Sequence, residues 1–524
     1  MKTKSIPHHG RGVEEFLARH GDKVTGVISG FDRLRLQGTL RALYVPEIFQ
    51  EYLWRAKVLC KDFKPHVTAV TERICASAAA VAREAGLAVR YVRSAATRKE
   101  DLVAEALRAR PVDEGLVAVL SAVEPCRTWK IRGNRETKRL EPRLEWGKCL
   151  HLYFYFVHAE FGLMHLRLQT WFPFLVHVCL NGREWLCRQL DRENLAYRRA
   201  DNCLPWIADV ARAQALLDAQ AKAPWRKWLP ALLERFHPDH QRLHDLLPVD
   251  YYWTVAQSEY ATDVMFKDRA TLQAVYPRLV HHALTSFGAT DVLRFLGRTH
   301  PGQSEVQSSR LTREEGTRIK HWVDANSLKL YDKGAVLRGE GTINHPEAFK
   351  VWRASERDPR GPKAWRPLRR SIADLPRRAE VSRAATDRYF GALAAVGHTA
   401  SLGESAATVC RPLHRKGRRH RAINPFHPDD AALLAAVNHG DFTVRGLRNR
   451  DVRARLYPHL PADTTPRQLA SRVSRQLALL RAHGLLARVA KTHRYIVTKK
   501  GRLVITALLT AAHANIEQLT KLAA

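Results

Sequence analysis

Three apolar segments follow one another between Cys149 and Leu180, and they constrain the fold more than any other part of this 524-residue chain. They read CLHLYFYFVH, GLMHLRLQTWF and FLVHVCL, and only short turns separate them. Short connections of this kind join antiparallel strands. Glu160, Arg167 and several histidines interrupt the region, which makes it too polar for a membrane span. The segments therefore predict an antiparallel sheet.

The N-terminal region predicts alternating strands and helices. LAVRYV, a helix through Leu102 to Leu107, and GLVAVLSAVEP read as a βαβ unit whose second strand is buried. Glu124 then falls at the carboxyl end of that strand, the edge where open α/β sheets place their ligands. In the segment SGFDRLRLQGTL, the alternation of residues places Asp32 on the apolar face.

The expected fold class is a multidomain α+β or α/β protein, with a mixed sheet core, helices and a separate C-terminal domain. A chain of this length is too long for one hydrophobic core. We expect an N-terminal α/β region over residues 1–148 and an antiparallel-sheet and helical region over 149–400, which together form the core. We expect a basic connector over 401–440 and then the separate C-terminal domain over 441–524.

The charge of the chain predicts a polyanionic partner. Lys and Arg total 86 against 52 Asp and Glu, a formal net charge of +34. Such an excess repels itself unless a polyanion neutralises it, and nucleic acid is the usual partner. Arginine-rich coding is the alternative, but it does not explain the deficit of acids. We therefore expect a nucleic-acid partner, with DNA favoured and structured RNA possible.

The eight cysteines and the start of the chain predict a cytoplasmic protein without a membrane partner. No two cysteines form a CxxC pair, so their spacing suits neither a zinc ribbon nor a disulfide framework. We interpret them as reduced thiols, most of them buried. The opening MKTKSIPHHGRGVEEF has no apolar core of the kind that a signal peptide requires.

The end of the chain has the clearest order of elements. TVRGLRNRDVRARLY predicts a helix opened by Thr443, and TPRQLASRVSRQLALLRAHG a second helix with Thr465 as N-cap and Gly484 as its stop. LLARV, AKTHR and YIVT follow as a basic hairpin, and an apolar helix starts at Leu503. This order resembles the winged helix-turn-helix domain of bacterial transcription regulators and replication initiators. The resemblance implies that the second helix and the wing contact DNA through Gln468, Ser471, Arg472, Arg475, Lys491, His493 and Arg494. The alternative is a protein-docking module with a solvated arginine face.

The segment NSLKLYDKGAVLRGEGTI predicts a hairpin with Gly334 at its turn. Its Tyr331-Asp332-Lys333, followed by Arg338-Gly339-Glu340, resembles rolling-circle replication initiators, related relaxases and filamentous-phage initiators. The resemblance implies a tyrosine that attacks a phosphate of single-stranded DNA, which one divalent metal polarises. It implies Tyr331 and Lys333 as catalytic residues. The paired His-hydrophobic-His motif that many of these families carry is not present in the sequence.

Acids in strand contexts supply candidate ligands for Mg²⁺ or Mn²⁺, which prefer oxygen. Glu259 and Asp263 lie four residues apart and so share a face. The full set of candidate metal ligands is Asp32, Glu124, Glu259, Asp263, Asp332 and Glu340. Besides Tyr331, the candidate nucleophiles are Tyr251, Tyr252 and Tyr260. The alternative is that these groups form polar turns and ion pairs.

The segment MHLRLQTWF predicts a strand face that could bind an unpaired base. His165, Arg167, Gln169 and Trp171 alternate along it, so two basic groups, an amide and an indole share one side. The alternative is a sheet face packed under a helix with its arginine in an ion pair.

Together these features predict a DNA-processing protein of a mobile element, of the single-strand nicking, replication-initiator or transposase type. As an enzyme it would be a metal-dependent DNA endonuclease or strand transferase. The alternative is a non-catalytic nucleic-acid-binding protein, either a transcription regulator or the protein component of an RNA–protein complex.

Overall fold

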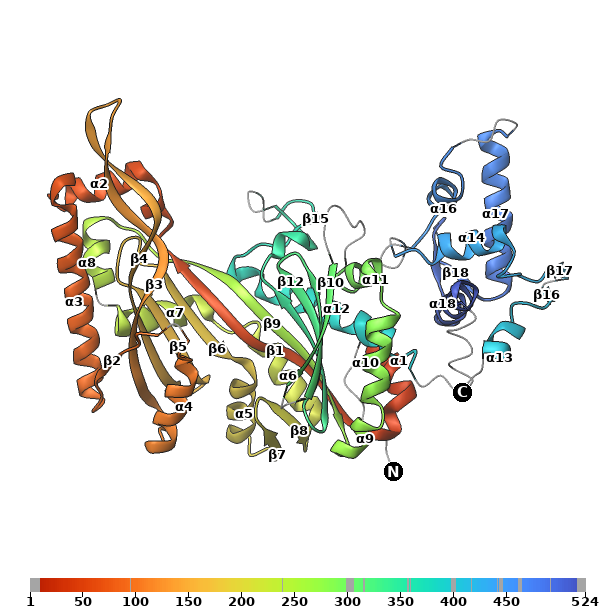
Figure 1. Cartoon of the computed structure of the whole chain (residues 1–524), viewed down its shortest axis with the longest axis horizontal. Coiled ribbons are helices and arrows are strands. Elements are labelled where there is room, and N and C mark those ends of the chain that lie inside the picture. Colours follow the sequence, from red (N-terminus) through yellow and green to blue (C-terminus); the bar gives the residue numbers. More distant parts are fainter. Residues whose placement is uncertain are drawn as a thin grey trace.

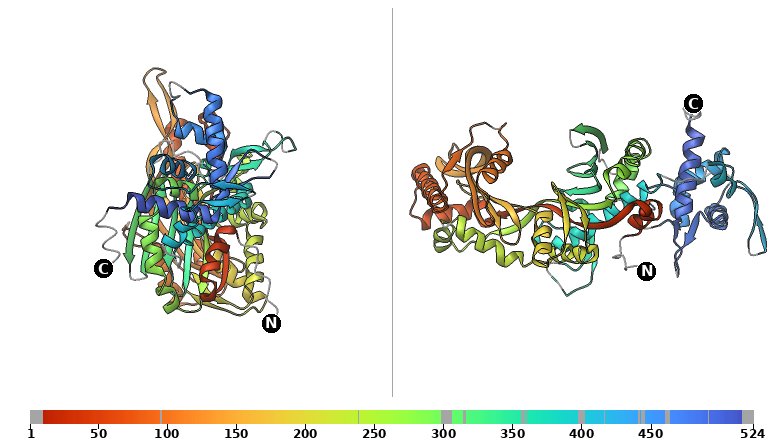
Figure 2. Two further views of the ribbon diagram at one scale, coloured as in Figure 1. Left: turned by 90° about the vertical axis from the view of Figure 1, so that its right-hand side faces the viewer. Right: turned by 90° about the horizontal axis from the view of Figure 1, so that it is seen from below.

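The structure of the protein is a computed structural model. It describes residues 10–94, 96–237, 239–297, 306–313, 316–355, 358, 360–396, 402–415, 417–440, 442, 446–459, 464–490 and 492–515. The molecule is an elongated α+β protein: one large sheet runs through its body, and a smaller, mostly helical unit lies at the C-terminal end (Figure 1, Figure 2).

The large sheet has eleven strands in the order β10-β11-β12-β13-β9-β1-β6-β5-β4-β3-β2. Neighbouring strands are antiparallel except for β2 and β3, which are parallel. The strands are β1 (Val24–Thr39), β2 (Val89–Tyr91), β3 (Gly115–Asn134), β4 (Arg139–His158), β5 (Gly162–Gln169), β6 (Val176–Asn181), β9 (Tyr252–Phe266), β10 (Val306–Arg313), β11 (Gly316–Val323), β12 (Asn326–Asp332) and β13 (Val336–Ile343).

Two long central strands, β1 and β9, connect the two ends of the body (Figure 1). Phe31 pairs with Tyr260 and Arg33 pairs with Glu259, so Asp32 is the extra residue of a β-bulge between them. A bulge re-aims side chains and often lies next to a functional site. β1 contributes apolar residues to two cores, with Leu34 in one and Val27 in the other.

Helices cover the sheet in two groups, each over its own core. The larger core packs under α2 (Pro46–Arg55), α3 (Phe63–Glu84), α5 (Gly182–Arg192), α6 (Val210–Gln220), α7 (Trp225–Phe236) and α8 (Asp239–Leu246). The second core packs under α1 (Arg11–His20), α9 (Arg269–Gln273), α10 (Tyr276–Thr285), α11 (Ala289–Phe295) and α12 (Leu375–Leu393). Two small hairpins, β7 (Tyr197–Ala200) with β8 (Cys203–Ile207) and β14 (Lys350–Arg353) with β15 (Ala364–Pro367), lie outside the large sheet.

The structure confirms the antiparallel sheet predicted after Cys149, in the pairing of β4 with β5 and of β5 with β6. It also confirms the βαβ unit, because β2 and β3 are parallel and α4 (Lys99–Ala109) joins them. The place of Glu124 was predicted wrongly. β3 continues past it to Asn134, because the residues that follow pair with the first half of β4, and Glu124 therefore lies inside the strand.

The expected division after residue 148 falls inside β4, so the regions on either side of it build one continuous sheet. The outer halves of β3 and β4 pair only with each other and form a two-stranded arm, which projects beyond α2 (Figure 1). Arg132, Arg135, Lys138 and Arg139 are exposed on it.

The C-terminal unit has its own core and begins earlier than the sequence predicted. Val409, Ile423 and Leu433, within the expected connector, pack in the same core as Val473 and Leu477. The connector is therefore part of the unit. Its elements are α13 (Leu402–Ala407), β16 (Leu413–Arg415), β17 (Arg418–His420), α14 (Pro428–Val437), α16 (Asn449–Leu456), α17 (Pro466–Ala482), β18 (Leu486–Arg488), β19 (Tyr495–Val497) and α18 (Lys499–His513).

The second predicted helix of this unit is confirmed in detail. The hydroxyl of Thr465 accepts a hydrogen bond from the backbone N–H of Gln468, and Gly484 follows the helix with a φ of +74°, which favours glycine. The first helix is shorter than predicted. α16 begins at Asn449 because Leu447 forms an isolated β-bridge with Tyr495, and Thr443 lies outside the described residues.

Candidate active site

Three of the predicted metal ligands converge on one face of the sheet. Asp32, Glu259 and Glu340 lie on the adjacent strands β1, β9 and β13, and each offers a carboxylate oxygen within 4.8 Å of the other two. Asp32 and Glu340 are buried, and Glu259 is half-buried. We call these three residues the carboxylate cluster.

Lys329 on β12 binds two members of this cluster. Its Nζ lies 3.1 Å from Oε1 of Glu259 and 2.5 Å from Oε1 of Glu340. The register of the hairpin places it there, because Lys329 pairs directly with Glu340. Burial opposes the charged ammonium, but Glu340 and Glu259 more than offset it and raise the pKa of Lys329 well above its usual range. Lys329 is therefore a fixed positive charge beside the cluster.

A second set of buried charges lies next to the cluster. Arg338 donates from Nε to Oδ1 of Asp263 at 2.7 Å and from Nη1 to Oδ1 of Asp32 at 2.9 Å. Nη2 of Arg183 lies 3.0 Å from Oδ2 of Asp263 and donates to the carbonyl oxygen of Ala261. We call Asp32, Asp263, Arg183 and Arg338 the buried ion network. It includes the predicted ligand Asp263, whose two oxygens are already occupied by guanidinium groups.

The sequence Asn181-Gly182-Arg183 explains how α5 delivers an arginine to this network. The Asn181 side chain caps the helix by accepting from the backbone N–H groups of Arg183 and Glu184. A Cβ on Gly182 would lie 1.9 Å from the carbonyl oxygen of Phe31. Glycine therefore lets the start of α5 approach β1 beside the bulge at Asp32.

Burial makes one carboxyl group of the cluster, that of Glu340, harder to ionise. Burial raises the pKa of Glu340 to about 7; Lys329 acts to lower this pKa, whereas Glu259 and Asp32 add to the rise. A divalent cation would favour the ionised carboxylate, and oxygen ligands of this kind suit Mg²⁺ or Mn²⁺. The residues therefore fit such an ion, with Asp32, Glu259 and Glu340 as its ligands.

Cations surround the cluster on its more open side. Arg33, whose side chain is 64% exposed, lies 3.9 Å from Glu259. On β11, Lys320 pairs with Lys329 and Arg318 pairs with Tyr331, so both basic side chains start from the same face as the cluster. Arg33, Arg318 and Lys320 form the cationic rim. A carboxylate centre with a cationic rim can hold a metal and a phosphate side by side.

Tyr331 shares this face, whereas Asp332 and Lys333 do not join the cluster. Burial raises the pKa of Tyr331, and the carboxylate of Glu340 adds to the rise. Asp332 lies on the opposite face, where it accepts from Gln273 and from the backbone N–H of Gly334. Lys333 lies at the turn, 3.3 Å from Asp201.

Glu124 lies away from the cluster and has its own partners. Its carboxylate accepts from Tyr153 at 2.6 Å, from Lys99 at 2.9 Å and from Arg167 at 2.7 Å. Burial opposes its ionisation, but hydrogen bonds from Tyr153 and Lys99 outweigh it and lower the pKa of Glu124 to about 2. We interpret Glu124 as a structural carboxylate.

The other candidate tyrosines do not reach the cluster. Tyr251 is buried in the larger core and donates its hydroxyl to the carbonyl oxygen of Phe174 at 2.7 Å. Tyr260 is buried on the opposite face, where its hydroxyl accepts from Arg383. Tyr252 lies near the end of β1, under the guanidinium of Arg41.

The predicted base-binding face is occupied by internal contacts. Gln169 is buried and donates to the carbonyl oxygens of Arg127 and Trp171, whose indole donates to Trp129. Arg167 binds Glu124, as described above, and burial lowers the pKa of the neighbouring His165 to about 4. Trp171 lies beyond the end of β5. The alternative, a packed sheet face with its arginine in an ion pair, fits these contacts.

Most of the predicted DNA-contacting residues of the C-terminal unit lie at its surface. Ser471, Arg472 and Arg475 are exposed on α17, opposite its buried residues Leu469 and Val473. The carboxamide oxygen of Gln468 accepts from Thr465 and completes the helix cap. His493 is exposed and Arg494 half-buried between β18 and β19, while Lys491 lies outside the described residues.

Sequence reasoning missed Lys329, Arg183 and the two cations of β11. The alternation of residues along NSLKLYD places Lys329 on the same side as Tyr331, so Lys329 could have been found from the hairpin. No local pattern marks Arg183, because its partner Asp263 lies 80 residues further along the chain.

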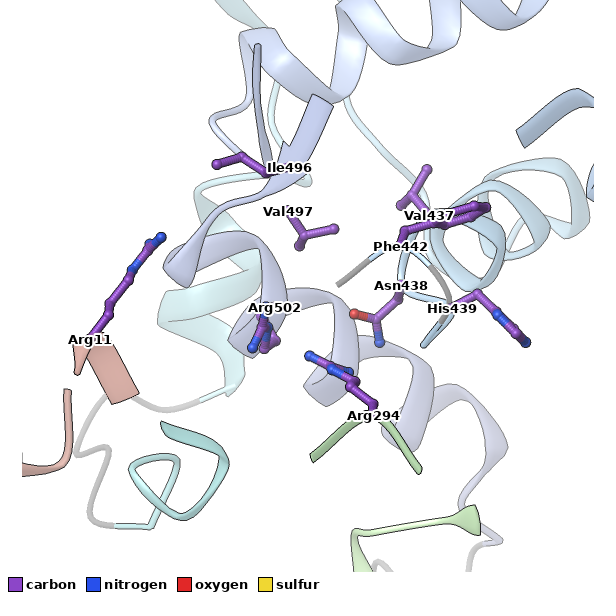
Figure 3. Close-up of a pocket in the computed structure, with 9 residues that line it drawn as sticks. All are labelled: Arg11, Arg294, Val437, Asn438, His439, Phe442, Ile496, Val497 and Arg502. Atoms are coloured by element: carbon purple, nitrogen blue, oxygen red, sulfur yellow. The ribbon is translucent and has the colours of Figure 1, made fainter. Parts of the chain in front are cut away.

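A pocket where the C-terminal unit meets the body is lined by cations (Figure 3). Arg11 comes from α1, Arg294 from α11 and Arg502 from α18. Burial and the nearby charge of Arg502 lower the pKa of Arg294 to about 10. Arg11 and Arg294 are already paired with Glu15 and Asp291, and the pocket is separate from the carboxylate cluster.

Comparison of the chain with profiles of known protein families, with characterised proteins and with solved structures gave no match. Within the described parts of the chain, no helix combines the length and the apolar character needed to cross a membrane.

Replacing Arg338 with methionine tests the buried ion network. The substitution keeps most of the side-chain volume but leaves Arg183 as the remaining guanidinium of the network beside Asp32 and Asp263. Removing one partner of a buried ion pair costs about 3–5 kcal/mol of unfolding free energy. We expect a loss of that size in urea unfolding, followed by fluorescence. Arg55→Met, which removes an ion pair from the surface of α2, should leave the unfolding midpoint nearly unchanged. Equal midpoints for the two variants would contradict the assigned role.

The pKa of Glu340 predicts a pH dependence of stability. Folding raises this pKa from 4.5 to about 7, so the folded state holds the proton more tightly. The protonated carboxyl of Glu340 therefore makes its full contribution to the free energy of unfolding below about pH 4.5. This contribution declines as the pH rises to about 7. Urea unfolding at several pH values should show this decline in the wild type and its reduction in Glu340→Gln. Glu105→Gln, an exposed carboxyl on α4, should keep the wild-type profile.

Proposed function

We propose that this protein binds nucleic acid and cuts single-stranded DNA at the carboxylate cluster, with Mg²⁺ or Mn²⁺ as cofactor. The observation that carries the proposal is the convergence of Asp32, Glu259 and Glu340 on the face that also holds Tyr331. The first three come from separate parts of the chain, and Tyr331 belongs to the hairpin that resembles replication initiators. Burying a group of carboxylates costs folding free energy unless a cation binds them.

The site provides each group that phosphodiester cleavage needs. The bound metal would polarise a non-bridging oxygen of the phosphate. The cationic rim, Arg33, Arg318 and Lys320, would hold the phosphates on either side. Tyr331 would attack the phosphorus and pass its proton to the carboxylate cluster. The bond to the 3′ oxygen would break, and this oxygen would take a proton back from the cluster, directly or through water, and leave as a hydroxyl while a 5′-phosphotyrosyl link remains.

Two basic surfaces support a nucleic-acid partner. The arm formed by β3 and β4 carries exposed Arg132, Arg135, Lys138 and Arg139. In the C-terminal unit, α14, the Leu447–Tyr495 bridge, α16, α17, the β18–β19 hairpin and α18 follow in the order that winged helices have. We propose that α17 is the recognition helix and that the unit selects the DNA site.

A non-catalytic nucleic-acid-binding protein is the second candidate, and one observation favours it. Lys329, Arg338 and Arg183 already neutralise much of the acidic charge on this face. In this alternative the carboxylates only stabilise the sheet, and the protein serves as a regulator or as part of an RNA–protein complex.

Nicking assays separate these candidates. Labelled single strands incubated with the protein and Mn²⁺ or Mg²⁺ should give a cut product and a covalent protein–DNA adduct on a denaturing gel. Tyr331→Phe should lose the adduct, because no nucleophilic oxygen remains, and Glu259→Gln should lose metal-dependent cutting. Both variants should still bind DNA.

Tyr251→Phe serves as the matched control, since it removes a tyrosine hydroxyl that is buried in the core. It should cut as the wild type does. If the wild type cuts no substrate from a pool of random and hairpin single strands with either metal, the protein belongs to the second candidate.

A double substitution on α17 tests the DNA-binding role of the C-terminal unit. Arg472 and Arg475 are exposed, so changing both to alanine should weaken duplex binding without unfolding the unit. An arginine that reads a base contributes about 1–3 kcal/mol of discrimination, whereas a phosphate contact changes the salt slope by about one. Fluorescence anisotropy against salt distinguishes the two. Arg226→Ala with Lys227→Ala removes the same charge from α7 and should change affinity much less. Equal losses of duplex affinity in the two double variants would show that binding depends only on the total charge of the protein.

A further inference from the structure

Two cysteines and a histidine meet at the root of the β3–β4 arm. Sγ of Cys126 lies 3.3 Å from Sγ of Cys149, although the two are 23 residues apart. One ring nitrogen of His151 lies within 4.8 Å of both sulfur atoms. All three residues are buried, and none belongs to the carboxylate cluster. This group is the thiol–imidazole site.

The spacing of the two sulfur atoms suits a metal better than a disulfide. In a tetrahedral zinc site with Zn–S bonds of about 2.3 Å, two sulfur atoms lie about 3.8 Å apart. A disulfide requires about 2.05 Å. The observed distance of 3.3 Å is about 0.5 Å shorter than the zinc value and more than about 1 Å longer than the disulfide value.

We propose that Cys126, Cys149 and His151 bind one Zn²⁺ ion, with a water molecule as the fourth ligand. Sulfur and imidazole nitrogen are the donors that zinc prefers, in contrast to the oxygen donors of the carboxylate cluster. Binding replaces the protons of two thiols with one divalent ion and releases two protons to solvent. The resulting site, two thiolates and Zn²⁺, is neutral, so it can remain buried.

The backbone beside the site holds the ring of His151. Nδ1 of His151 lies 3.2 Å from the carbonyl oxygen of Cys149, a contact that can fix the orientation of the ring. Hydrogen bonds of this kind orient metal-binding histidines.

The location of the site gives the metal a structural role. β4 pairs with β5 from His151 onward, whereas the residues before His151 pair only with β3. Cys126 and Cys149 therefore lie where the multi-stranded sheet becomes a two-stranded arm. A two-stranded ribbon has little stability of its own in water. A metal that joins both strands at this point would fix the direction of the basic arm.

Metal analysis of the full-length protein tests the proposal. The protein, purified without chelator, is dialysed against Zn²⁺ and then against metal-free buffer, and zinc is measured by mass spectrometry. We expect one tightly held zinc per chain, and X-ray absorption at the zinc edge should show two sulfur ligands and at least one nitrogen. Cys149→Ser and His151→Ala should lose this zinc, while Cys410→Ser, which removes a thiol from the C-terminal unit, should retain it.

The wild-type protein alone can overturn the proposal, so a variant that fails to fold does not leave it untested. Zinc bound only through oxygen and nitrogen would place the metal elsewhere. A wild-type protein that retains no zinc and has eight titratable thiols would show that the site holds no metal. A protein that has two fewer titratable thiols in the absence of reductant would show a disulfide instead.

Discussion

The buried ion network joins three strands and a helix through specific charge contacts, which fix their relative positions more narrowly than apolar packing does. Arg338, on β13, contacts Asp32 on β1 and Asp263 on β9, and Arg183 contacts Asp263 from α5. These charges are nearly inaccessible to water, where an unpaired charge is costly. Each member therefore requires the others, and the three strands can align in only one register. The carboxylate cluster depends on that register.

The two neighbouring sets of charges differ in how easily their members can exchange one partner for another. In the network, Arg338 holds Asp263 through two parallel hydrogen bonds and leaves it little room to exchange partners. In the cluster, one lysine ammonium serves two glutamates, and burial raises the pKa of Glu340 to about 7. An incoming cation could displace Lys329 from the cluster far more easily than it could displace Arg338 from Asp263. Asp263 and its two arginines thus act as a rigid frame, and the cluster, which shares Asp32 with the network, is the part that can respond to a ligand.

Sequence reasoning succeeded where the pattern was local. Alternation and turn residues identified the strands after Cys149, the hairpin around Gly334 and the capped helix that begins at Pro466. Asp32 is buried as expected, but the β-bulge there breaks the alternation that was used to predict it. Sequence reasoning failed for Glu124, because the apolar run ended well before the strand did.

Long-range features could not be read in this way. The approach of Arg183 to Asp263 depends on the tertiary packing of α5 against β1. Cys126 and Cys149 were interpreted as separate buried thiols, because their 23-residue spacing carries no signal until the register of the arm is known. The base-binding face was predicted from alternation alone, which cannot tell an open face from one whose groups are already satisfied.

The central place of β1 in the sheet also governs the order in which the protein can form during synthesis. Its partners β6 and β9 leave the ribosome long after it. The same holds for α1, because α12, the helix against which it packs, is synthesised much later. Until β6 and β9 emerge, a strand of sixteen residues, with many apolar side chains, has no neighbour to pair with. Contacts so distant in sequence slow folding and expose unpaired strands to association. The nascent chain should therefore need protection, by a chaperone or by rapid translation, until at least β9 has emerged.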